Sequence, residues 1–187
     1  MSEIKPWKIL QSDYVVENEK YRLRKDICQV PDGTIIQDYF VREEPDAVIM
    51  CCVTKDNNVV LVRQYRHGLG ATTLEFPGGY ISRHDINAVE AMRRELMEET
   101  GFSVDRVEPL GTFILAPSTA AAKVTVYLGT DGERITAPQY IPDEHTEVEL
   151  VTVAALPELL KNPDFVSMVH VAALSLALSA LGGHDKQ

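Results

Sequence analysis

Three glutamates are spaced so that one turn of a helix would bring their carboxylates together: Glu95, Glu98 and Glu99. They lie within Asn87–Thr100, where apolar residues recur at helical spacing and predict a helix that Gly101 ends. Carboxylates this close repel one another. A hard divalent cation such as Mg²⁺ makes their closeness favourable, because it is coordinated by carboxylate oxygens and by substrate phosphates at the same time. The spacing predicts either a magnesium site or, as is usual for a charge run, a solvated acidic face.

The residues around the three acids favour the metal site. Arg94 precedes Glu98 by four residues and is expected to pair with it, which would fix one carboxylate while the others face a metal. Ala88 and Ala91 fall on the acidic face one and two turns earlier, where small side chains are expected to leave open space. A glycine turn, Pro77–Gly79, comes shortly before the helix, and glycines let the backbone approach a cation closely.

The segment Arg94–Phe102, RELMEETGF, resembles the Nudix box, G-x5-E-x7-R-E-U-x-E-E-x-G-U, in which U is apolar. It matches the second half of that pattern at every fixed position. Two further stretches, VRQYR at Val62–Arg66 and LEFPGG at Leu74–Gly79, resemble the ADP-ribose and nucleoside-diphosphate-sugar pyrophosphatase subfamily.

The first half of the box departs from the pattern. Counted from Gly79, the fixed glutamate falls at Asp85, and one residue too many then separates Asp85 from Arg94. Shifting the register instead puts Ile86 at the glutamate position. A one-residue insertion in the loop Ser82–Asn87 accounts for this, since a surface loop absorbs an extra residue at small entropic cost. The departure leaves the role of the first acid open.

Length and composition limit the protein to ordinary globular classes. Its 187 residues, 45% hydrophobic and 25% charged, predict one domain with an appendage. The net charge of −10 argues against nonspecific binding to nucleic acid or to an anionic membrane. Cys28, Cys51 and Cys52 form no metal-binding pair and predict buried free thiols in a reducing cytoplasm. No stretch is long and apolar enough to span a bilayer.

The order of β-favouring and helical runs predicts an α/β fold in two parts. Residues 1–45 read as a β-rich segment, and residues 46–187 as strands covered by helices, with Gly129–Glu144 as a long polar loop. The last helix is expected over Phe165–Leu181, ended by Gly182 and Gly183. The resemblance implies a Nudix α/β/α sandwich with a mixed central sheet. It also implies that residues 1–45 form a dimerisation domain and that the protein is a homodimer.

The resemblance implies the reaction and its metal. Water would attack a phosphorus of a nucleoside diphosphate sugar, giving a nucleoside monophosphate and a sugar phosphate. The cofactor would be Mg²⁺, with Mn²⁺ as a substitute. Glu95 and Glu99 are the first choices as ligands, Glu98 is the next, and the carbonyl of Gly78 matches the family's main-chain ligand.

The same family places its general base on a loop far beyond the box, here about Pro142–Glu149. Glu147 is the first candidate and Glu144 the second, while Glu149 and His145 are alternatives, and each of the acids could instead be a plain solvated residue. Arg94 is grouped with the catalytic residues because it is expected to fix Glu98.

Three residues are candidates for substrate binding. Arg66 matches a subfamily arginine, and a guanidinium suits bidentate capture of phosphate. Glu75 matches a subfamily acid near the metals, with a cross-strand salt bridge as the structural alternative. Arg42 is a candidate for reaching the site of a partner subunit.

Two other functions remain open on the sequence. One is a housecleaning hydrolase of nucleoside triphosphates or dinucleoside polyphosphates, although minimal members of that class lack an N-terminal β segment. The other is a non-catalytic sensor of an ADP-ribose-like ligand. Such modules tend to lose box acids, whereas this chain keeps Glu95, Glu98 and Glu99.

Overall fold

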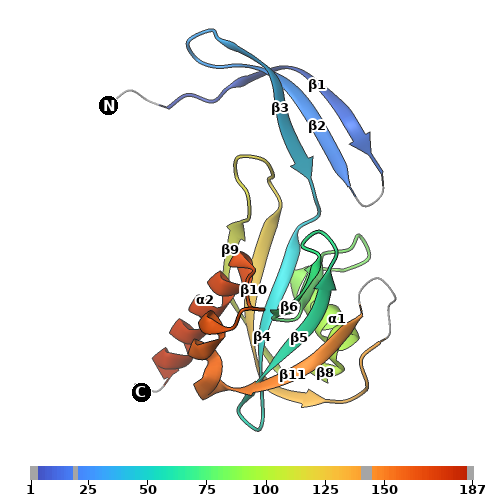
Figure 1. Ribbon diagram of the computed structural model, residues 1–187, viewed down its shortest axis with the longest axis vertical. Helices are drawn as coiled ribbons and strands as arrows, with labels where there is room; N and C mark the ends of the chain where they lie inside the picture. The colour runs from blue at the N-terminus through green and yellow to red at the C-terminus, as the bar shows by residue number, and fades with distance from the viewer. Residues whose placement is uncertain (1–3, 19–20, 140–144, 185–187) are drawn as a thin grey trace. The chain divides into compact units, whose positions relative to one another are not determined.

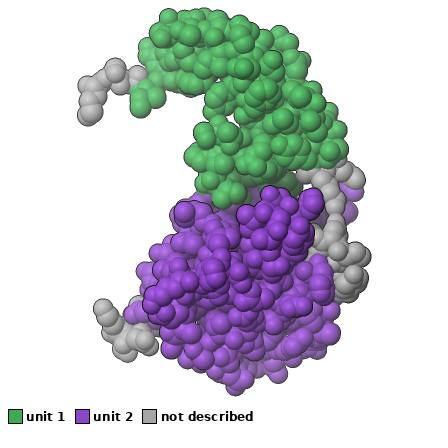
Figure 2. Space-filling model, viewed as in Figure 1, with its two compact units in different colours: residues 1–45, 114–123 green, residues 46–113, 124–187 purple. Residues whose placement is uncertain are grey.

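A computed structural model of the protein describes residues 4–18, 21–139 and 145–184. The chain divides into two compact units (Figure 2). The smaller comprises Met1–Pro45 and Ile114–Lys123, and the larger comprises Asp46–Phe113 and Val124–Gln187. The segment Ile114–Lys123 thus groups with the N-terminal unit, although it lies far along the sequence. No helix among the described residues is long and apolar enough to cross a membrane.

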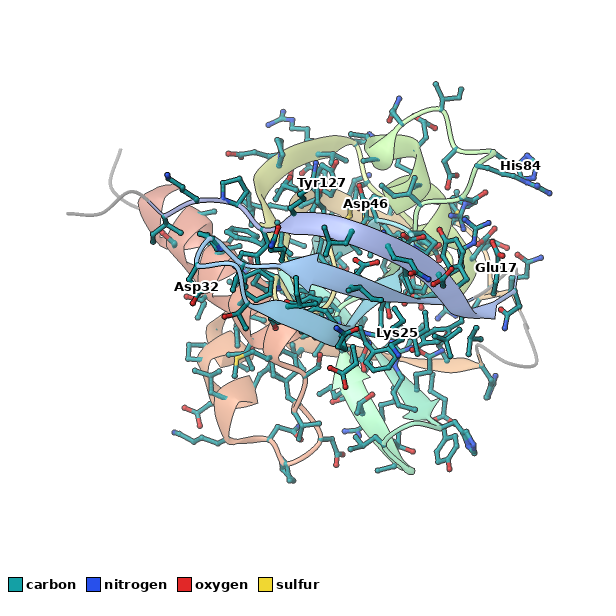
Figure 3. All side chains as sticks on the ribbon, turned by 90° about the horizontal axis from the view of Figure 1, so that it is seen from above. Glu17, Lys25, Asp32, Asp46, His84 and Tyr127 are labelled. Carbon is teal, nitrogen blue, oxygen red and sulfur yellow. The ribbon has the colours of Figure 1, made fainter. Side chains whose placement is uncertain are left out.

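The smaller unit is built on an antiparallel sheet of three strands in the order β1–β2–β3, which confirms the expected β-rich N-terminus. The strands are β1 (Lys8–Glu17), β2 (Arg22–Gln29) and β3 (Ile35–Glu43). Figure 3 shows Glu17 at the end of β1 and Lys25 on β2. Within this unit the ring of Trp7 packs edge-on against Tyr39 at 5.6 Å, and the Tyr39 hydroxyl donates to the carbonyl of Ser118.

The larger unit contains a mixed sheet of eight strands (Figure 1). Its main path runs β11–β5–β4–β10–β8, with β6 on β5, β7 on β4 and β9 on β10. Strand β10 is parallel to β4, whereas β5 is antiparallel to β4, β6 and β11. The strands are β4 (Ala47–Thr54), β5 (Asn58–Arg66), β6 (Ala71–Glu75), β7 (Gly78–Tyr80), β8 (Phe102–Ser103), β9 (Arg106–Ile114), β10 (Lys123–Arg134) and β11 (Thr146–Thr152).

Helices cover both faces of this sheet. Because side chains alternate along a strand, β4 supplies both cores. Val48, Met50 and Cys52 pack with α1 (Ala88–Thr100) on one face. Ile49, Cys51 and Val53 of the same strand pack on the other face with the 3-10 helix η1 (Val153–Lys161) and with α2 (Met168–His184). The expected α/β/α sandwich with a mixed central sheet is therefore present.

Three details of the sequence interpretation were wrong. Strand β10 continues to Arg134, so residues 129–134 are not loop; a bulge between Gly129 and Gly132 lets the strand end paired with β8. The last helix begins at Met168 and not at Phe165, and it runs to His184 without stopping at Gly182, since a glycine costs only about 1 kcal/mol within a helix. Ala91 leaves no open space, because it is fully buried in the core beneath α1.

Candidate active site

A glycine turn lies directly against the acidic face of helix α1. Strand β7 pairs with β4 so that Gly78 is opposite Ile49 and Gly79 is opposite Val48. A Cβ atom on Gly79 would come within 2.4–2.6 Å of the Glu95 carboxylate, and one on Gly78 within 2.3 Å of the Val48 carbonyl oxygen. A side chain at Gly78 would collide with backbone and one at Gly79 would displace the Glu95 carboxylate, so the two glycines let the backbone pass directly over that carboxylate.

Helix α1 ends at Gly101 as its sequence predicts, and it begins at Ala88, one residue after the expected start. The Asn87 side chain accepts hydrogen bonds from the amides of Val89 and Glu90, which makes it the N-cap. Gly101 adopts φ 74° and ends the helix with a bond from its amide to the Met97 carbonyl. Met92 and Leu96 are fully buried, and the acids lie on the neighbouring face of the helix, where Glu95 is itself 8% exposed. Each of these buried side chains stabilises the fold by roughly 1.5–3 kcal/mol.

Arg94 is surrounded by carboxylates. Its NH1 group lies 2.9 Å from Glu95 Oε1 and 3.0 Å from Glu98 Oε2, so the expected ion pair with Glu98 is present. Its Nε and NH2 groups donate to the two oxygens of Asp85, each at 2.9 Å, and NH2 also donates to the Tyr80 carbonyl at 3.1 Å. The hydrogen bonds to Asp85, together with the charges of Glu95 and Glu98, outweigh desolvation and raise the pKa of Arg94.

Asp85 takes a defined place in this cluster despite the extra residue in its loop. Its side chain is only 7% exposed and binds Arg94 in the bidentate manner that two carboxylate oxygens allow. The Ser82 amide donates to Asp85 Oδ2 at 2.7 Å, which closes the loop. Hydrogen bonding by Arg94, more than the opposing desolvation, lowers the pKa of Asp85. Neighbouring Ile86 is 89% exposed, so the register that places it at the glutamate position is disfavoured.

Glu95, Glu98 and Glu99 fit a hard cation by the chemistry of their oxygens. Glu95 lies beneath Gly79, and Glu99 Oε2 accepts from the Gly78 amide at 2.9 Å, so two of the acids border the glycine turn. As they stand, no three His, Cys, Asp or Glu side chains within residues 4–18, 21–139 and 145–184 converge to hold a metal ion. Arg94 holds Glu95 and Glu98 instead. The donors therefore match Mg²⁺ in type and in closeness to the turn, and their role as ligands stays a prediction.

The two substrate-binding candidates of the larger unit are bonded to each other. Arg66, at the end of β5, donates from Nε to Glu75 Oε1 at 3.0 Å and from NH2 to Oε2 at 2.5 Å. Hydrogen bonding by Glu75 outweighs desolvation and raises the pKa of Arg66, and the charge of Glu99 acts in the same direction. Glu99 in turn accepts from the amide of Gly78, three residues beyond Glu75. The side chain of Arg66 is 46% exposed and that of Glu75 only 5%.

His170 of α2 belongs to the same group, and no sequence pattern predicted it as a site residue. Its Nε2 lies 3.0 Å from Glu75 Oε2, and its Nδ1 accepts from the Phe76 amide at 3.3 Å. Thr73 donates to Glu75 Oε1 at 2.6 Å. Burial favours a protonated Glu75, but the hydrogen bonds from His170 and Arg66 outweigh it and hold the pKa of that carboxyl well below its ordinary value. A lone histidine on an apolar helix carries no sequence signal for such a contact.

The strand register separates the acids proposed as general base. Thr146 and Val148 of β11 face α1: the Thr146 hydroxyl donates to the Glu99 carbonyl, and Val148 packs with the α1 core. Because side chains alternate along a strand, Glu147 and Glu149 face the side of the sheet away from α1. On that side Glu149 pairs with Arg63 at 2.7 Å. Glu147 is exposed and directly opposite Arg63 on the neighbouring strand. Glu144 lies outside the described residues.

Arg42 belongs to the smaller unit. It pairs with Glu44 at 3.1 Å and its amide donates to the Thr119 carbonyl. Its guanidinium is 38% exposed, so part of it remains accessible.

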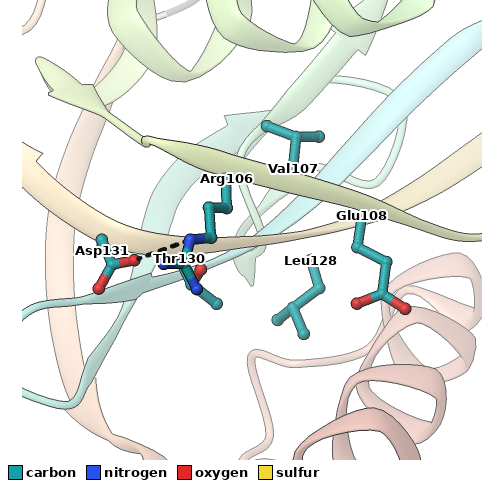
Figure 4. A pocket seen from close by; sticks show the side chains of 6 residues that line it. All are labelled: Arg106, Val107, Glu108, Leu128, Thr130 and Asp131. Atoms are coloured by element: carbon teal, nitrogen blue, oxygen red, sulfur yellow. Dashed lines mark ion pairs between the residues drawn. The ribbon is translucent and has the colours of Figure 1, made fainter.

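A shallow pocket of about 500 Å³ lies elsewhere, on β9 and β10 (Figure 4). It is lined by Arg106, Val107, Glu108, Leu128, Thr130 and Asp131. Leu128 belongs to the core cluster of η1 and α2, on the face of the sheet away from α1. The one ion pair drawn there joins Arg106 to Asp131 at 3.9 Å between exposed side chains. The pocket has neither clustered carboxylates nor buried donors, and the glycine turn over α1 is the better candidate site.

Two family models match the chain. The model described as NUDIX domain matches residues 44–170, and the one described as nucleoside diphosphate sugar hydrolase N-terminal domain matches residues 7–41. The first match contains the glycine turn, α1 and His170, and the second contains most of the three-stranded sheet.

Several known proteins are similar to this chain. The methanol dehydrogenase activator of Bacillus methanolicus is 30% identical over 65% of this chain, which spans 64% of that protein, slightly less than two-thirds. The ADP-ribose pyrophosphatase of Bacillus subtilis (strain 168) is 25% identical over 83% of each chain. A crystal structure of an ADP compounds hydrolase covers 100% of both chains with a TM-score of 0.89 at 24% identity, a likeness that shows the fold.

Proposed function

The chain belongs to the NUDIX domain family and is a Nudix hydrolase, and on that premise we propose that it hydrolyses the pyrophosphate bond of ADP-ribose or a related nucleoside diphosphate sugar. The observation that carries the proposal is the acidic group of α1 beneath the glycine turn, which begins two residues after Glu75, the partner of Arg66. The match of residues 7–41 to the N-terminal domain of nucleoside diphosphate sugar hydrolases supports the same substrate class.

Glu95, Glu98, Glu99 and the carbonyl of Gly78 are the residues we propose to hold Mg²⁺, with Mn²⁺ as a substitute. When bound, the metal would neutralise pyrophosphate charge and lower the pKa of a coordinated water. Arg94 and Asp85 set the resting positions of Glu95 and Glu98, because all three carboxylates share one guanidinium. The Gly78 amide orients Glu99 toward the turn.

The general base is proposed to be an acid of the segment Pro142–Glu149, which leads into β11 and includes its first residues. Glu149 forms an ion pair with Arg63, and in the register of β11 with β5 the side chain of Glu147 lies on the same face as that of Glu149. Glu144 is therefore our first choice, and Glu147 stays as the alternative. Such a carboxylate would take the proton of the attacking water, a task that contributes roughly 10²–10⁴-fold to rate.

Arg66 is proposed to contact a substrate phosphate. Two N–H groups of Arg66 donate to Glu75, and the Arg66 side chain as a whole is 46% exposed to solvent. An arginine held from one side keeps a fixed orientation, so that its remaining donors can meet an anion at little further entropic cost.

We also propose that the protein is a homodimer formed through the N-terminal sheet. All ten residues of β1 are exposed, and they include large apolar side chains such as Ile9, Leu10 and Val15. Apolar surface of this extent usually marks a protein interface. Arg42 is the candidate for entering the partner's site.

We further propose a cytoplasmic location. The three cysteines are free and buried, which fits a reducing compartment.

Mixing two inactive variants would test Arg42 in the dimer. Arg42→Ala and Glu99→Gln would be refolded together. If Arg42 acts across the interface, half of the dimers are mixed and each has one intact site, so activity returns to about a quarter of wild type. Activity no higher than that of the separate variants would refute action across the interface, and a monomer by light scattering would refute the dimer.

The decisive experiment for the reaction is a substrate panel with Mg²⁺ or Mn²⁺. It would contain ADP-ribose, other ADP- and GDP-sugars, nucleoside triphosphates and a dinucleoside polyphosphate. Products would be separated by chromatography, and phosphate release by added alkaline phosphatase would report the monoesters, since the intact diphosphate sugar resists that enzyme.

We expect AMP and ribose 5-phosphate from ADP-ribose, and no cleavage without metal. Preferred cleavage of triphosphates or dinucleoside polyphosphates would favour the housecleaning alternative. Binding of ADP-ribose without cleavage of any compound would favour the sensor, which the retained box acids disfavour.

A further inference from the structure

His170 is a buried polar residue on an otherwise apolar part of α2. It is 6% exposed, and the residues that follow it on the inner side of the helix, Ala173, Leu174 and Ala177, are fully buried in the core. Packing alone would be served as well by a leucine or phenylalanine. A histidine at this position needs partners, because an unbonded polar group in a core costs roughly 1–3 kcal/mol.

Both ring nitrogens of His170 are used, and their partners fix the protonation state. The Phe76 amide can only donate, so Nδ1 carries a lone pair and accepts its bond at 3.3 Å. The Glu75 carboxylate accepts, so Nε2 carries the proton at 3.0 Å. These two contacts define a neutral imidazole of the Nε2–H form. An imidazolium would direct an N–H group at the N–H group of Phe76.

The ring is also held by aromatic packing. Its centroid lies 6.3 Å from that of Phe76 and 6.5 Å from that of Phe165, and these two phenylalanines pack edge to face at 5.9 Å. The orientation of the imidazole is thus set before it bonds to Glu75. A donor that is already oriented loses little entropy on bonding, and the bond constrains its acceptor effectively.

Glu75 transmits this constraint to Arg66. Its oxygens receive four hydrogen bonds, two from Arg66, one from Thr73 and one from His170. Without His170, Oε2 would keep only the Arg66 bond, and the carboxylate could rotate with the guanidinium. The second contact of His170 lies at Phe76, the residue immediately before the Pro77–Gly79 turn.

We propose that His170 is a positioning residue for hydrolysis: by holding the Glu75 carboxylate and the Phe76 amide together, it fixes Arg66 relative to the glycine turn. This inference rests on the proposed function. His170 touches neither substrate nor metal in this scheme and acts through Glu75 and the turn.

Three substitutions separate the two contacts. His170→Phe removes both and keeps an aromatic ring between Phe76 and Phe165. His170→Gln places an amide N–H near the position of Nε2 and can still donate to Glu75, whereas His170→Asn places an amide oxygen near Nδ1 and can still accept from Phe76. Rates would be measured with the preferred diphosphate sugar at saturating Mg²⁺.

For His170→Phe we expect kcat/KM to fall roughly tenfold, mainly through a higher KM, which corresponds to one charge-assisted hydrogen bond. His170→Gln should recover most of this loss and His170→Asn little. Leu174→Val is the matched control, since it loosens the core one turn further along α2 and leaves the aromatic and polar contacts of His170 in place, and its KM should equal that of wild type. Folded His170→Phe with wild-type KM, or equal losses in His170→Phe and His170→Gln, would overturn the proposal.

Nuclear magnetic resonance tests the geometry without any turnover. The ¹⁵N shifts of His170 should report the Nε2–H form that its two hydrogen-bond partners require. The Arg66 Nε–H signal, assigned by its loss in Arg66→Lys, should be sharp in wild type and broadened in His170→Asn. An imidazolium, an Nδ1–H form, or an unchanged Arg66 signal in that variant would refute the inference. If the wild-type protein cleaves no diphosphate, the proposed function fails, and these spectra still decide whether His170 orders Arg66.

Discussion

Two arginines of the candidate site are both held by carboxylates, yet their charge surroundings differ. Arg66 meets one carboxylate, Glu75, whose other donors are a hydroxyl and a neutral imidazole. Arg94 meets the carboxylates of Asp85, Glu95 and Glu98. The group around Arg66 is therefore electrically balanced, whereas the group around Arg94 carries excess negative charge even before Glu99 is counted.

The difference indicates distinct tasks. The charges of Arg66 and Glu75 neutralise each other and require no additional ion. The pair therefore serves to orient the exposed part of Arg66. Excess carboxylates repel one another, by ~4 kcal/mol for two charges 4 Å apart near a protein surface, and this energy is recovered when a cation binds. The Arg94 group is thus suited to attract a metal, and the Arg66 group to attract the phosphate that the metal accompanies.

The largest expected effect comes from removing one of the carboxylates of α1 that are proposed to bind the metal. Glu99→Gln should lower kcat by about three orders of magnitude, because a bound metal contributes several kcal/mol and each 1.36 kcal/mol is tenfold. Binding of ADP-ribose, measured by calorimetry, should change little. Steady-state rates over a range of Mg²⁺ concentrations would check this.

Glu90→Gln is the control for that experiment. Glu90 lies exposed in the first turn of the same helix, away from the glycine turn, and its replacement should leave kcat unchanged. A Glu99→Gln protein that hydrolyses within tenfold of wild type would remove the distinction between the two arginine groups.

The second prediction concerns a variant that breaks the ion pair of Arg66 with Glu75. Glu75→Gln should destabilise the folded state by about 3 kcal/mol, the lower end for breaking a buried ion pair, because Arg66 is half exposed and can regain water. Urea denaturation followed by circular dichroism would measure the loss. Glu158→Gln, which breaks the exposed pair with Lys161, should cost less than ~0.5 kcal/mol.

The same variant predicts a pH dependence of known sign. The folded pKa of Glu75 is depressed below its ordinary value of 4.5, so its carboxylate stabilises the protein fully above that value and loses this contribution as the pH falls below it. The stability difference between wild type and Glu75→Gln should therefore be constant near neutral pH and narrow below about pH 4.5. A difference that widens on acidification would contradict the assigned network.

The sequence predicted the Arg94 group far better than the Arg66 group. Helix α1, its end at Gly101 and the pair of Arg94 with Glu98 all follow from residues a few positions apart on one helix, where spacing fixes geometry. The contact between Asp85 and Arg94 could not be predicted, because the extra loop residue hides its register. The contact is seen only in the folded loop, where the Ser82 amide holds Asp85 beside the guanidinium of Arg94.

The Arg66 group depends on contacts between distant segments. Glu75 and His170 are 95 positions apart in the numbering, and no periodicity relates a strand end to one residue of the last helix. The error at β10 has a similar cause, since residues 129–134 are polar enough to read as loop and become strand only through pairing with β4 and β8. Tertiary pairing overrides local composition at both places.

The third prediction tests whether Arg94 needs its altered first acid. Asp85→Asn removes the charge of a carboxylate that makes two bonds to the guanidinium, and we expect kcat/KM to fall roughly tenfold, equivalent to ~1.5 kcal/mol. His84→Gln, an exposed change in the same loop, is the control (Figure 3). Rates with saturating metal would measure both. An unchanged rate in Asp85→Asn would mean that Glu95 and Glu98 suffice to hold Arg94.

The smallest effect is expected from an acid that belongs to neither arginine group. Glu147 is exposed and opposite Arg63 on the face of β11 away from α1, so Glu147→Gln should keep kcat/KM within about twofold, as is usual for a surface substitution. Glu149→Gln breaks the pair with Arg63 and should lower stability more than activity. Parallel rate and denaturation measurements on both variants, beside Glu144→Gln, would assign the base. A loss of two or more orders of magnitude in Glu147→Gln would show that β11 turns this side chain toward the acids of α1 during turnover, and the base would then be Glu147.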